Sequence, residues 1–466
     1  MSPSRATAVL AALALATGAR AARAQVAPDL APLDSLVRSE LARTGTPGAS
    51  IAVVANGQIV YAKAFGIADV ERGDPVTPET LFRVGSVTKM FTGALLAQLA
   101  EAGRLDLHAP ISRYVPELEG KRVGTVTSHQ LLTHTAGWLD NAVPYGRMGE
   151  GALGEVMREV GDTLFITEPG RVLSYSNPGY SMLGYVAEQA GGKRYAALMD
   201  ELVLQPAGMT RSTFKPLVAM TMRVSQGHEG PRGAAATLVR PFTENTAQWG
   251  AGFLMSTATE LAQFAQVVMA AGRQPNGGAA LAPGAVRQMT TGHVVVPGQE
   301  ATGGRYGYGL IVGRRGPLET LQHGGSINGF QSQVVMVPSR GFAVIILANR
   351  AGSQLPGVVD RAAELVLGEL PGRPEPPAGR TATPAEITAL VGRYAVGTTA
   401  VEFTDRGGQL VFRQGAGEFP ALIHGPHHVG ITPPGASAPI LLALVPGPDG
   451  RIAYLHQGLR AIPRVP

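Results

Sequence analysis

Strand-like segments lie near both ends of the first 370 residues of the chain, and this placement limits most strongly what the chain can fold into. Asn56-Gly57, the dipeptide most typical of a two-residue β-hairpin, separates the first two apolar runs. A mostly helical stretch at 128–208 lies between the early and the late runs. We therefore expect an α/β (α+β) fold, with an antiparallel sheet flanked by helices and an all-helical subdomain. The expected strands are 49–55, 58–64, 310–312, 331–337 and 342–348.

Apolar residues recur at helical spacing at 33–41, at 257–270 and in a stretch that begins at Ser86. In the stretch after Ser86 these residues are Met90, Leu95, Leu96 and Leu99. Gly103 follows them and is typical of the residue just after a helix. Ser86 is therefore expected at or near a helix N-terminus.

A proline-rich stretch at 371–377 divides the chain, because such a composition favours an extended, semi-rigid linker. Beyond it, short apolar runs separated by Gly, Pro or Asp predict a small β-rich domain, with a barrel as one arrangement. Those runs are 400–404, 409–413, 440–445 and 452–456. The expected divisions are a signal peptide at 1–24, a main domain at 25–370, a linker at 371–384 and the β-rich domain at 385–466.

The first residues follow the pattern of a secretory signal: Arg5, an apolar run, then Ala22-Arg23-Ala24 before Gln25. We expect cleavage near Ala24/Gln25 and a periplasmic or secreted mature protein. No later apolar run approaches the roughly 20 residues of a spanning helix, so no integral membrane span is expected. The signal holds three arginines and no acidic residue, so its removal lowers the formal net charge from +5 to +2. Such a charge gives no reason to expect a nucleic-acid partner.

Ser86 and Lys89 place a hydroxyl and an amine three positions apart, on one face of the expected helix. A serine hydroxyl becomes a good nucleophile when a neighbour takes its proton, and a lysine with a pKa lowered by burial can help. An arginine cannot, because its guanidinium stays protonated in proteins. Lysine fills only five of the 39 basic positions, which favours a chemical role here. The five are Lys63, Lys89, Lys121, Lys193 and Lys215.

Two further motifs follow this pair along the chain. Tyr175-Ser176-Asn177 offers a phenol that an ammonium can hold as phenolate, and an amide that can bind a substrate carbonyl. The glycines of His323-Gly324-Gly325-Ser326 allow a strand edge to approach a ligand, so that a strand N–H can complete an oxyanion hole. Taken singly, the three motifs also fit a helix cap, a loop turn and a β-bulge. Their order is what favours catalysis.

The three motifs in this order resemble the class C β-lactamase, DD-peptidase and esterase branch of the serine β-lactamase and penicillin-binding-protein superfamily. Other stretches similar to that branch are 131–137, 205–209, 251–257 and 346–349. The resemblance covers roughly 33–370 and implies a β-lactamase-like transpeptidase fold with serine hydrolase activity through an acyl-enzyme.

The resemblance also implies a role for each motif residue. Ser86 is the nucleophile, and Lys89 assists its deprotonation. Tyr175 acts as general base and then as acid toward the leaving group, while Asn177 orients the substrate. The backbone N–H groups of Ser86 and Ser326 form the oxyanion hole.

One departure from the family pattern bears on the substrate. Where most β-lactamases and DD-peptidases have Lys-Thr-Gly, this chain has His323-Gly324-Gly325, and no lysine follows Lys215. An imidazole, which titrates near roughly pH 6.5, attracts a substrate carboxylate less than an ammonium does. Family members with His-x-Gly include esterases and D-amino-acid peptidases or amidases. We therefore expect small ester or amide substrates, with β-lactams and short D-amino-acid peptides as further candidates. The expected substrate-binding residues are Asn177, His323, Gly324, Gly325 and Ser326.

A second hypothesis is a catalytically weak, penicillin-binding-like protein that binds or senses its ligand. The intact serine, lysine, tyrosine and asparagine of the first two motifs argue against it. We expect no cofactor and no metal, and the absence of cysteine excludes disulfides, thiol nucleophiles and Cys-type metal sites. His424, His427 and His428 lie in a Gly/Pro turn without an acidic partner, which favours a solvated loop over a metal site. The sequence does not define the oligomeric state.

Overall fold

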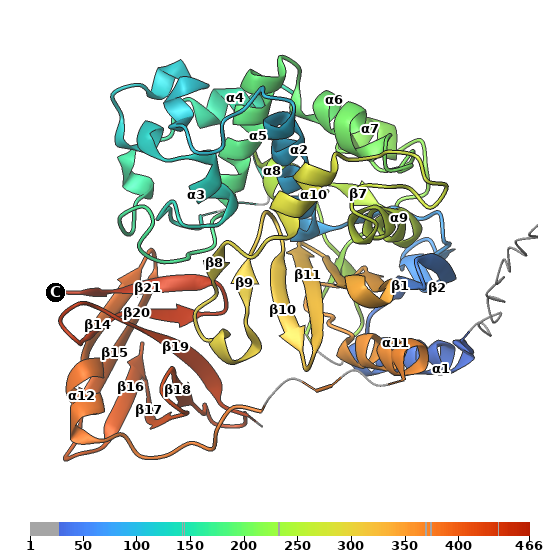
Figure 1. Ribbon diagram of the computed structural model, residues 1–466. Helices are drawn as coiled ribbons and strands as arrows, with labels where there is room; N and C mark the ends of the chain where they lie inside the picture. The colour runs from blue at the N-terminus through green and yellow to red at the C-terminus, as the bar shows by residue number, and fades with distance from the viewer. Residues whose placement is uncertain are drawn as a thin grey trace, which may run out of the picture.

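The computed structural model describes residues 28–141, 143, 145–231, 234–368, 371–372, 375–436 and 438–466. The expected signal peptide at 1–24 lies outside the described residues. Figure 1 shows a larger body of sheet and helices, coloured from blue through green and yellow to the orange of α11, with a β-barrel in orange and red beside it. The expected α/β (α+β) class and small C-terminal β domain are confirmed. None of the described helices is long and apolar enough to cross a bilayer.

One antiparallel sheet organises the larger body, and its strands come from both ends of the sequence as expected. In the described residues it has nine strands, in the order β3-β2-β1-β13-β12-β11-β10-β9-β8. The central pair, β1 and β13, places Ile51 opposite Ile346. The bounds are β1 Gly48–Ala55, β2 Gln58–Asp69, β3 Asp74–Pro75, β8 Val294–Val295, β9 Arg305–Tyr306, β10 Ile311–Arg315, β11 Leu318–Ile327, β12 Phe330–Val337 and β13 Phe342–Ala348.

The pattern of burial explains why the sheet lies in the middle of this body. All seven residues of β13 are buried. Its successive side chains enter two different apolar clusters, Val344 in one and Ile345 in the other, because neighbours on a strand point to opposite faces. A sheet that is apolar on both faces needs a layer of helices on each. The predicted hairpin turn between β1 and β2 is present, with φ of 51° at Asn56 and 73° at Gly57.

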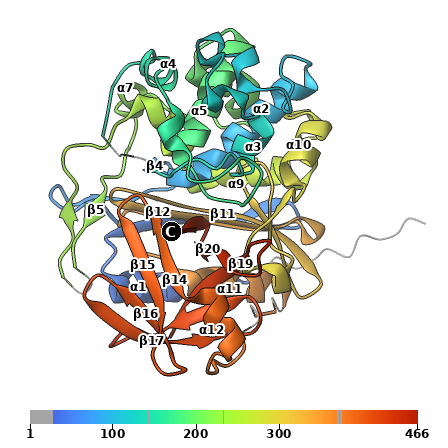
Figure 2. The same cartoon turned by 90° about the vertical axis from the view of Figure 1, so that its left-hand side faces the viewer.

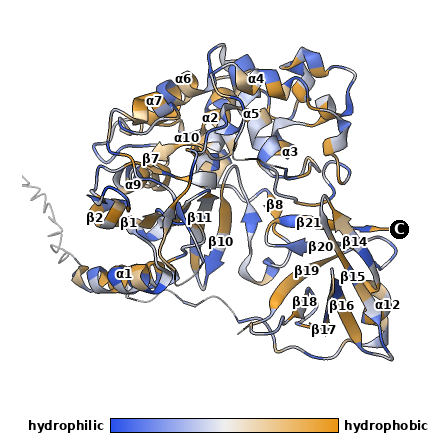
Figure 3. Cartoon of the chain, turned by 180° about the vertical axis from the view of Figure 1, so that it is seen from behind, coloured by the Kyte–Doolittle hydropathy of each residue, from blue (hydrophilic) through white to orange (hydrophobic). Residues whose placement is uncertain are grey.

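Two helices that lie far apart in the sequence together cover one face of the sheet, called here the outer face. They are α1, Ala31–Thr44, and α11, Pro356–Leu367. Leu33, Val37 and Leu41 of α1 are buried, and the residues between them leave alternating apolar and polar colours along the helix in Figure 3. This periodicity is what predicted the helix from sequence.

Helix α2, Thr88–Glu101, lies at the centre of the layer that covers the other face, and nearly all of its residues are buried. Gly103 follows it with φ +70°, as expected for the residue after a helix. Ser86 lies near the N-terminus of this helix, as expected: it belongs to a 3₁₀ turn, η1 (Gly85–Val87), that directly precedes α2. The chain enters this turn through Gly85 at φ +52°, and that left-handed residue delays regular α-helical geometry.

The remaining helices form the rest of this layer and the helical block above it in Figures 1 and 2. Their bounds are α3 Ser128–Leu132, α4 Ala152–Met157, α5 Asn177–Gly191, α6 Tyr195–Met199, α7 Pro216–Ala219, α8 Trp249–Gly252, α9 Ala258–Met269 and α10 Pro283–Thr290. Two small strand pairs accompany them: β4 (Phe82–Arg83) with β7 (Met255–Ser256), and β5 (His228–Glu229) with β6 (Thr237–Leu238).

The C-terminal strands close into a barrel because β14 pairs with both β15 and the last strand, β21. Alternate residues such as Tyr394, Phe403 and Leu455 fill its interior. The four expected runs correspond to β15, β16, β19 and β20. The bounds are β14 Gly392–Val396, β15 Thr399–Asp405, β16 Leu410–Gln414, β17 Gly417–Ile423, β18 His428–Ile431, β19 Ile440–Pro446, β20 Ile452–Gln457 and β21 Arg460–Val465.

The segment that leads into the barrel also contacts it. Helix α12, Pro384–Leu390, begins with a capping box between Thr383 and Glu386. His424 is buried, and its Nδ1 lies 2.9 Å from the carbonyl oxygen of Pro377 in the proline-rich stretch. The expectation of a solvated loop is therefore wrong for His424, because this contact removes its ring from water.

Candidate active site

Ser86 lies at the floor of a hollow of about 160 Å³ between the sheet and the helical layer. Its 3₁₀ turn packs directly against β11: a Cβ added to Gly85 would lie 2.8 Å from the backbone nitrogen of Ser326. The hollow also has Asn177 and Ser326 in its lining. The remaining lining residues are Val143, Gln248, Ala251, Gly252, Phe253, Ile327 and Asn328. The structure thus brings together three of the residues selected from three separate motifs.

Lys89 lies beneath Ser86 and is completely buried, at 0% exposure. Its Nζ lies 2.6 Å from the Asn177 Oδ1, 2.6 Å from the Ala251 carbonyl oxygen and 3.4 Å from the Ser86 Oγ. Burial holds the pKa of Lys89 well below its usual value, because a charged amine loses the solvation that water would give it. An amine in this position can take a proton from the serine.

Tyr175 and Asn177 lie on either side of Ser176, whose side chain caps helix α5 by accepting a hydrogen bond from the Gly179 N–H. The Tyr175 ring lies 4.7 Å from the Lys89 Nζ. Burial raises the pKa of Tyr175, whereas a hydrogen bond with Ser86 acts to lower it. The phenol is thus favoured in its protonated form, which suits a proton donor or a relay better than a free phenolate.

The edge of β11 approaches the nucleophile at Gly325. A Cβ on Gly325 would lie 2.1 Å from the Val84 carbonyl oxygen and 3.0 Å from the Ser86 backbone nitrogen, so only glycine fits. Gly324, on the other side of the strand, is exposed, and a Cβ there would have Ser332 O at 3.8 Å as its neighbour. Gly325 therefore lets the Ser326 N–H come next to the nucleophile.

His323 is not among the residues that line the Ser86 hollow, although its ring centroid lies 6.4 Å from that of Tyr175. It is 5% exposed, its Nε2 lies 3.2 Å from the Tyr306 hydroxyl, and its Nδ1 lies 2.6 Å from the Gly324 carbonyl oxygen. Burial and the nearby Lys89 lower its pKa to about 3. The ring is therefore neutral at physiological pH and carries no charge that could attract a substrate carboxylate.

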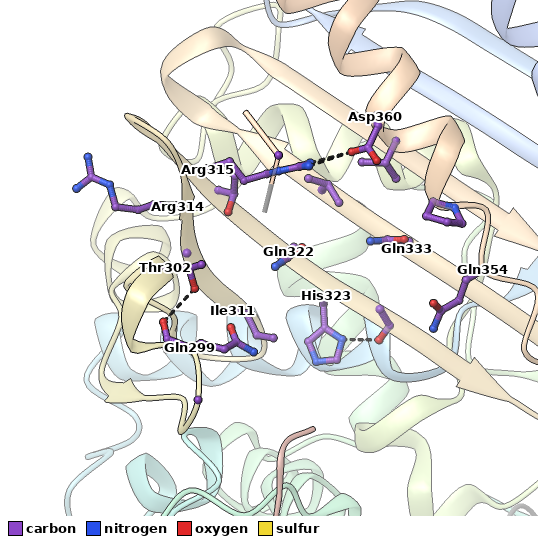
Figure 4. A pocket seen from close by; sticks show the side chains of 18 residues that line it. Gln299, Thr302, Ile311, Arg314, Arg315, Gln322, His323, Gln333, Gln354 and Asp360 are labelled. Carbon is purple, nitrogen blue, oxygen red and sulfur yellow. Dashed lines mark hydrogen bonds and ion pairs between the residues drawn. The ribbon is translucent and has the colours of Figure 1, made fainter. Parts of the chain in front are cut away.

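His323 borders a different and larger pocket of about 770 Å³, shown in Figure 4. That pocket lies between the outer face of β10–β12 and α11, with Gln322 and Gln333 projecting from the strands and Asp360 from the helix. Ser86, Lys89, Tyr175 and Asn177 are absent from its lining.

Three further residues contact the site: His134, which lies in the 131–137 stretch similar to the family, and Asp140 and Arg460, which carried no recognisable signal in the sequence. His134, with φ 57°, stacks on Tyr175 at 4.3 Å between ring centroids, and its Nδ1 accepts a hydrogen bond from the Ser176 N–H. Asp140 accepts hydrogen bonds from the Asn177 backbone and side-chain amides. Arg460, from the barrel, pairs with Asp140. Contacts between residues so distant in sequence could not be found from spacing.

The described residues contain no group of three or more His, Cys, Asp and Glu side chains placed to hold a metal ion. The groups that meet at Ser86 are instead a hydroxyl, an amine, a phenol and an amide. The Ser86 N–H of the 3₁₀ turn and the Ser326 N–H of β11 lie beside them, and such a set of groups is compatible with nucleophilic acyl transfer.

This fold and site define a serine hydrolase of the β-lactamase and penicillin-binding type. The model of the Beta-lactamase family matches residues 33–369, and the chain belongs to that family. Among curated proteins it is similar to protein flp of Staphylococcus aureus strain N315, with 26% identity over 339 residues, covering 70% of this chain and 64% of that protein. A D-aminopeptidase of Gluconobacter oxydans is 27% identical over 371 residues, covering 78% of this chain and 66% of the other. The chain thus spans about two thirds of the length of these relatives.

Solved structures extend the similarity to the barrel. A crystal structure of SurE with D-Leu aligns with 93% of this chain and 99% of its own, at 26% identity and a TM-score of 0.74. Since 93% coverage reaches beyond the family match at residue 369, this neighbour shares the barrel as well as the sheet-and-helix body.

Proposed function

We propose that the protein is an exported serine hydrolase that forms an acyl-enzyme at Ser86 and acts on small ester or amide substrates. The observation that carries the proposal is the buried Lys89 amine, which lies within reach of both Ser86 and Asn177. A lysine this deeply buried is costly unless it has a chemical or structural partner, and here its partners are the motif residues themselves.

In the proposed reaction the Ser86 oxygen attacks the substrate carbonyl carbon while its proton passes to the Lys89–Tyr175 pair. Burial lowers the pKa of Lys89, which makes its amine the better proton acceptor of the pair. Tyr175, which burial keeps protonated, then delivers a proton to the leaving alcohol or amine. Water hydrolyses the resulting ester at Ser86 by the reverse sequence of proton transfers.

The carbonyl oxygen gains negative charge as the bond to Ser86 forms. In the proposal the backbone N–H groups of Ser86 and Ser326 hold this oxygen, since Gly325 brings β11 against the nucleophile. Asn177 lies beside them in the hollow and orients the substrate amide or ester.

The substrate class follows from the neutral strand edge and from the relatives. A buried, uncharged His323 offers a carboxylate no permanent cation, which favours esters and small amides over β-lactams. A D-aminopeptidase and a protein crystallised with D-Leu are among the similar proteins, which supports D-amino-acid amides or peptides as one subset.

The test is a panel of p-nitrophenyl esters, D- and L-amino-acid p-nitroanilides and nitrocefin, assayed with wild type and Ser86→Ala. We expect hydrolysis of esters or D-amino-acid anilides by wild type, weaker turnover of nitrocefin, and loss of all turnover in Ser86→Ala. Equal hydrolysis by the two proteins contradicts the proposal. Slow binding without turnover on any substrate favours the sensor hypothesis.

A further inference from the structure

The turn between β20 and β21 joins the barrel to the segment that carries the Tyr-Ser-Asn motif. The Tyr175 N–H donates to the Leu459 carbonyl oxygen at 2.7 Å, and the Ala461 N–H donates to the Ser174 Oγ at 3.2 Å. The His456 Nε2 lies 2.8 Å from the Leu173 carbonyl oxygen. Leu459 packs in an apolar cluster with residues of the sheet-and-helix body, including Leu173. This turn therefore fixes the backbone on which Tyr175 stands.

Arg460, the first residue of β21, reaches further into the site than the backbone contacts do. Its Nε and Nη2 donate to the Asp140 Oδ2 at 2.8 Å and 2.5 Å, and its guanidinium lies 5.0 Å from the centre of the Tyr175 ring. The Asp140 side chain is 11% exposed, whereas that of Arg460 is 53% exposed. A carboxylate this buried requires a cation or several donors, and Arg460 supplies the cation.

Asp140 passes the contact on to the catalytic residues. Its Oδ1 accepts hydrogen bonds from the Asn177 N–H at 3.1 Å and from the Asn177 Nδ2 at 2.8 Å. These bonds hold the side-chain nitrogen of Asn177 toward Asp140. The Oδ1 of Asn177 is therefore directed to the Lys89 Nζ, which lies 2.6 Å away. The series of contacts thus runs from the barrel to the amine beside Ser86.

We infer that Arg460 is a positioning residue for acylation: by pairing with Asp140 it holds Asn177 and Lys89 in place, and so makes the hydrolase depend on its barrel. The inference rests on the proposed acyl-enzyme chemistry at Ser86. It assigns the C-terminal barrel a role in the reaction, through a residue that acts on Asn177 and Lys89 by way of Asp140.

Electrostatics gives this role a measurable signature. Asp140 raises the pKa of Lys89 and Arg460 lowers it, and the same two charges act in the same directions on the pKa of Tyr175. Four other ionisable side chains lie around Lys89 and Tyr175. They are His134, Tyr180, Tyr306 and His323. Burial keeps these histidines neutral and these phenols protonated over the assay range, so they do not change charge there.

The test is the pH dependence of kcat/KM in Arg460→Ala, Asp140→Asn and the double variant. Loss of the positive charge leaves Asp140 uncompensated, which favours the protonated amine. We therefore expect the ascending limb of the Arg460→Ala profile to move alkaline by about one pH unit, with about a tenfold loss at pH values on that limb. Asp140→Asn, which keeps the shape of the side chain, moves the limb to lower pH, and the double variant returns toward wild type.

Three comparisons make the test decisive. Arg413→Ala removes an equally exposed arginine on β16 that pairs with Glu402 and Glu418, and it should leave the profile unchanged. Arg460→Lys keeps the charge without the planar fork, so its limb should stay near wild type while its rate falls. Thermal unfolding of each variant shows whether the barrel is still folded.

A limb that stays in place in all Arg460 and Asp140 variants overturns the inference. The inference is also overturned if the limb moves in the same direction in Arg460→Ala and Asp140→Asn. A purely structural role of the two residues predicts a general loss of activity, without shifts of opposite direction. If wild type is not acylated at Ser86, the proposed function fails, and the inference about Arg460 fails with it. An acylated wild type with an unmoved limb contradicts the role of Arg460 alone.

Discussion

At the scale of single residues, Lys89 shows how burial lowers the pKa of a common side chain, so that it can act as a proton acceptor in the proposed reaction. The same ammonium on the surface would stay protonated at neutral pH, but here a buried position beside Ser86 lowers its pKa. Its remaining protons are satisfied by Asn177 and the Ala251 carbonyl oxygen. The amine is thus held in place by groups that do not compete for the serine proton.

Lys89→Arg should therefore be nearly as damaging as Lys89→Ala. The guanidinium keeps the positive charge but cannot give up a proton, and its bulk does not fit a fully buried site. We expect each variant to lose about 10²- to 10⁴-fold in kcat/KM, the usual contribution of a positioned acid or base.

Lys63→Arg is the matched control, because Lys63 lies half-exposed on β2 in an ion pair with Asp34. It should retain wild-type activity. Near-native turnover by Lys89→Arg would show that Lys89 acts by its charge alone.

At the scale of elements, the contact between η1 and β11 forms the oxyanion hole in this account. It depends on the absence of a side chain at Gly325, where a Cβ would collide with the Val84 carbonyl oxygen at 2.1 Å. Gly325→Ala should push the strand from the nucleophile and cost about 10²-fold or more in kcat, the typical loss when one oxyanion donor is removed.

Gly324→Ala provides the comparison on the same strand, one position away. A Cβ there meets open space except for the Ser332 carbonyl oxygen at 3.8 Å, so activity should fall by no more than about threefold. Equal losses in the two variants, measured as kcat on one ester, would indicate general damage to β11 rather than displacement of the Ser326 N–H.

How far the sequence predicts these elements depends on whether the signal is local. The hairpin at Asn56-Gly57 and the end of α2 at Gly103 were predictable, because turn and cap residues impose their own backbone geometry. The barrel strand β21 was missed, since Pro463 and two arginines obscure its alternation.

The candidate site divides in the same way. The positions of Ser86, Lys89, Tyr175 and Asn177 were predicted from motifs, and the structure brings these residues together. Asp140 and Arg460 were not, because their ion pair links residues 320 positions apart through tertiary packing. The low pKa of His323 is another tertiary effect: it follows first from burial of the ring, which contacts the Tyr306 hydroxyl, and then from the nearby Lys89.

At the scale of the whole molecule, buried histidines couple the site to stability. His134 and His323 have pKa values far below the value near 6.5 that they have when unfolded. As pH falls through 6.5 the unfolded chain binds protons at these histidines, whereas the folded protein does not. The contribution of the neutral rings to the free energy of unfolding is therefore complete above that pH and decreases below it. Each histidine should remove up to about 1.4 kcal/mol of unfolding free energy per pH unit.

Urea unfolding at pH 7.5 and 5.5 measures this effect. We expect the difference between the two pH values to shrink in His323→Gln and to persist in the control His108→Gln, since His108 is exposed. A difference that is unchanged by His323→Gln would mean that this ring is protonated in the folded protein.

The claim on which the account depends is that Ser86 becomes covalently acylated. The most direct measurement is peptide mass spectrometry after treatment with a fluorophosphonate or a labelled penicillin, on wild type and on Ser86→Ala. We expect an adduct on the wild-type peptide that contains Ser86, and none on the variant. An adduct on another residue, or hydrolysis by wild type with Ser86 never modified, would contradict it.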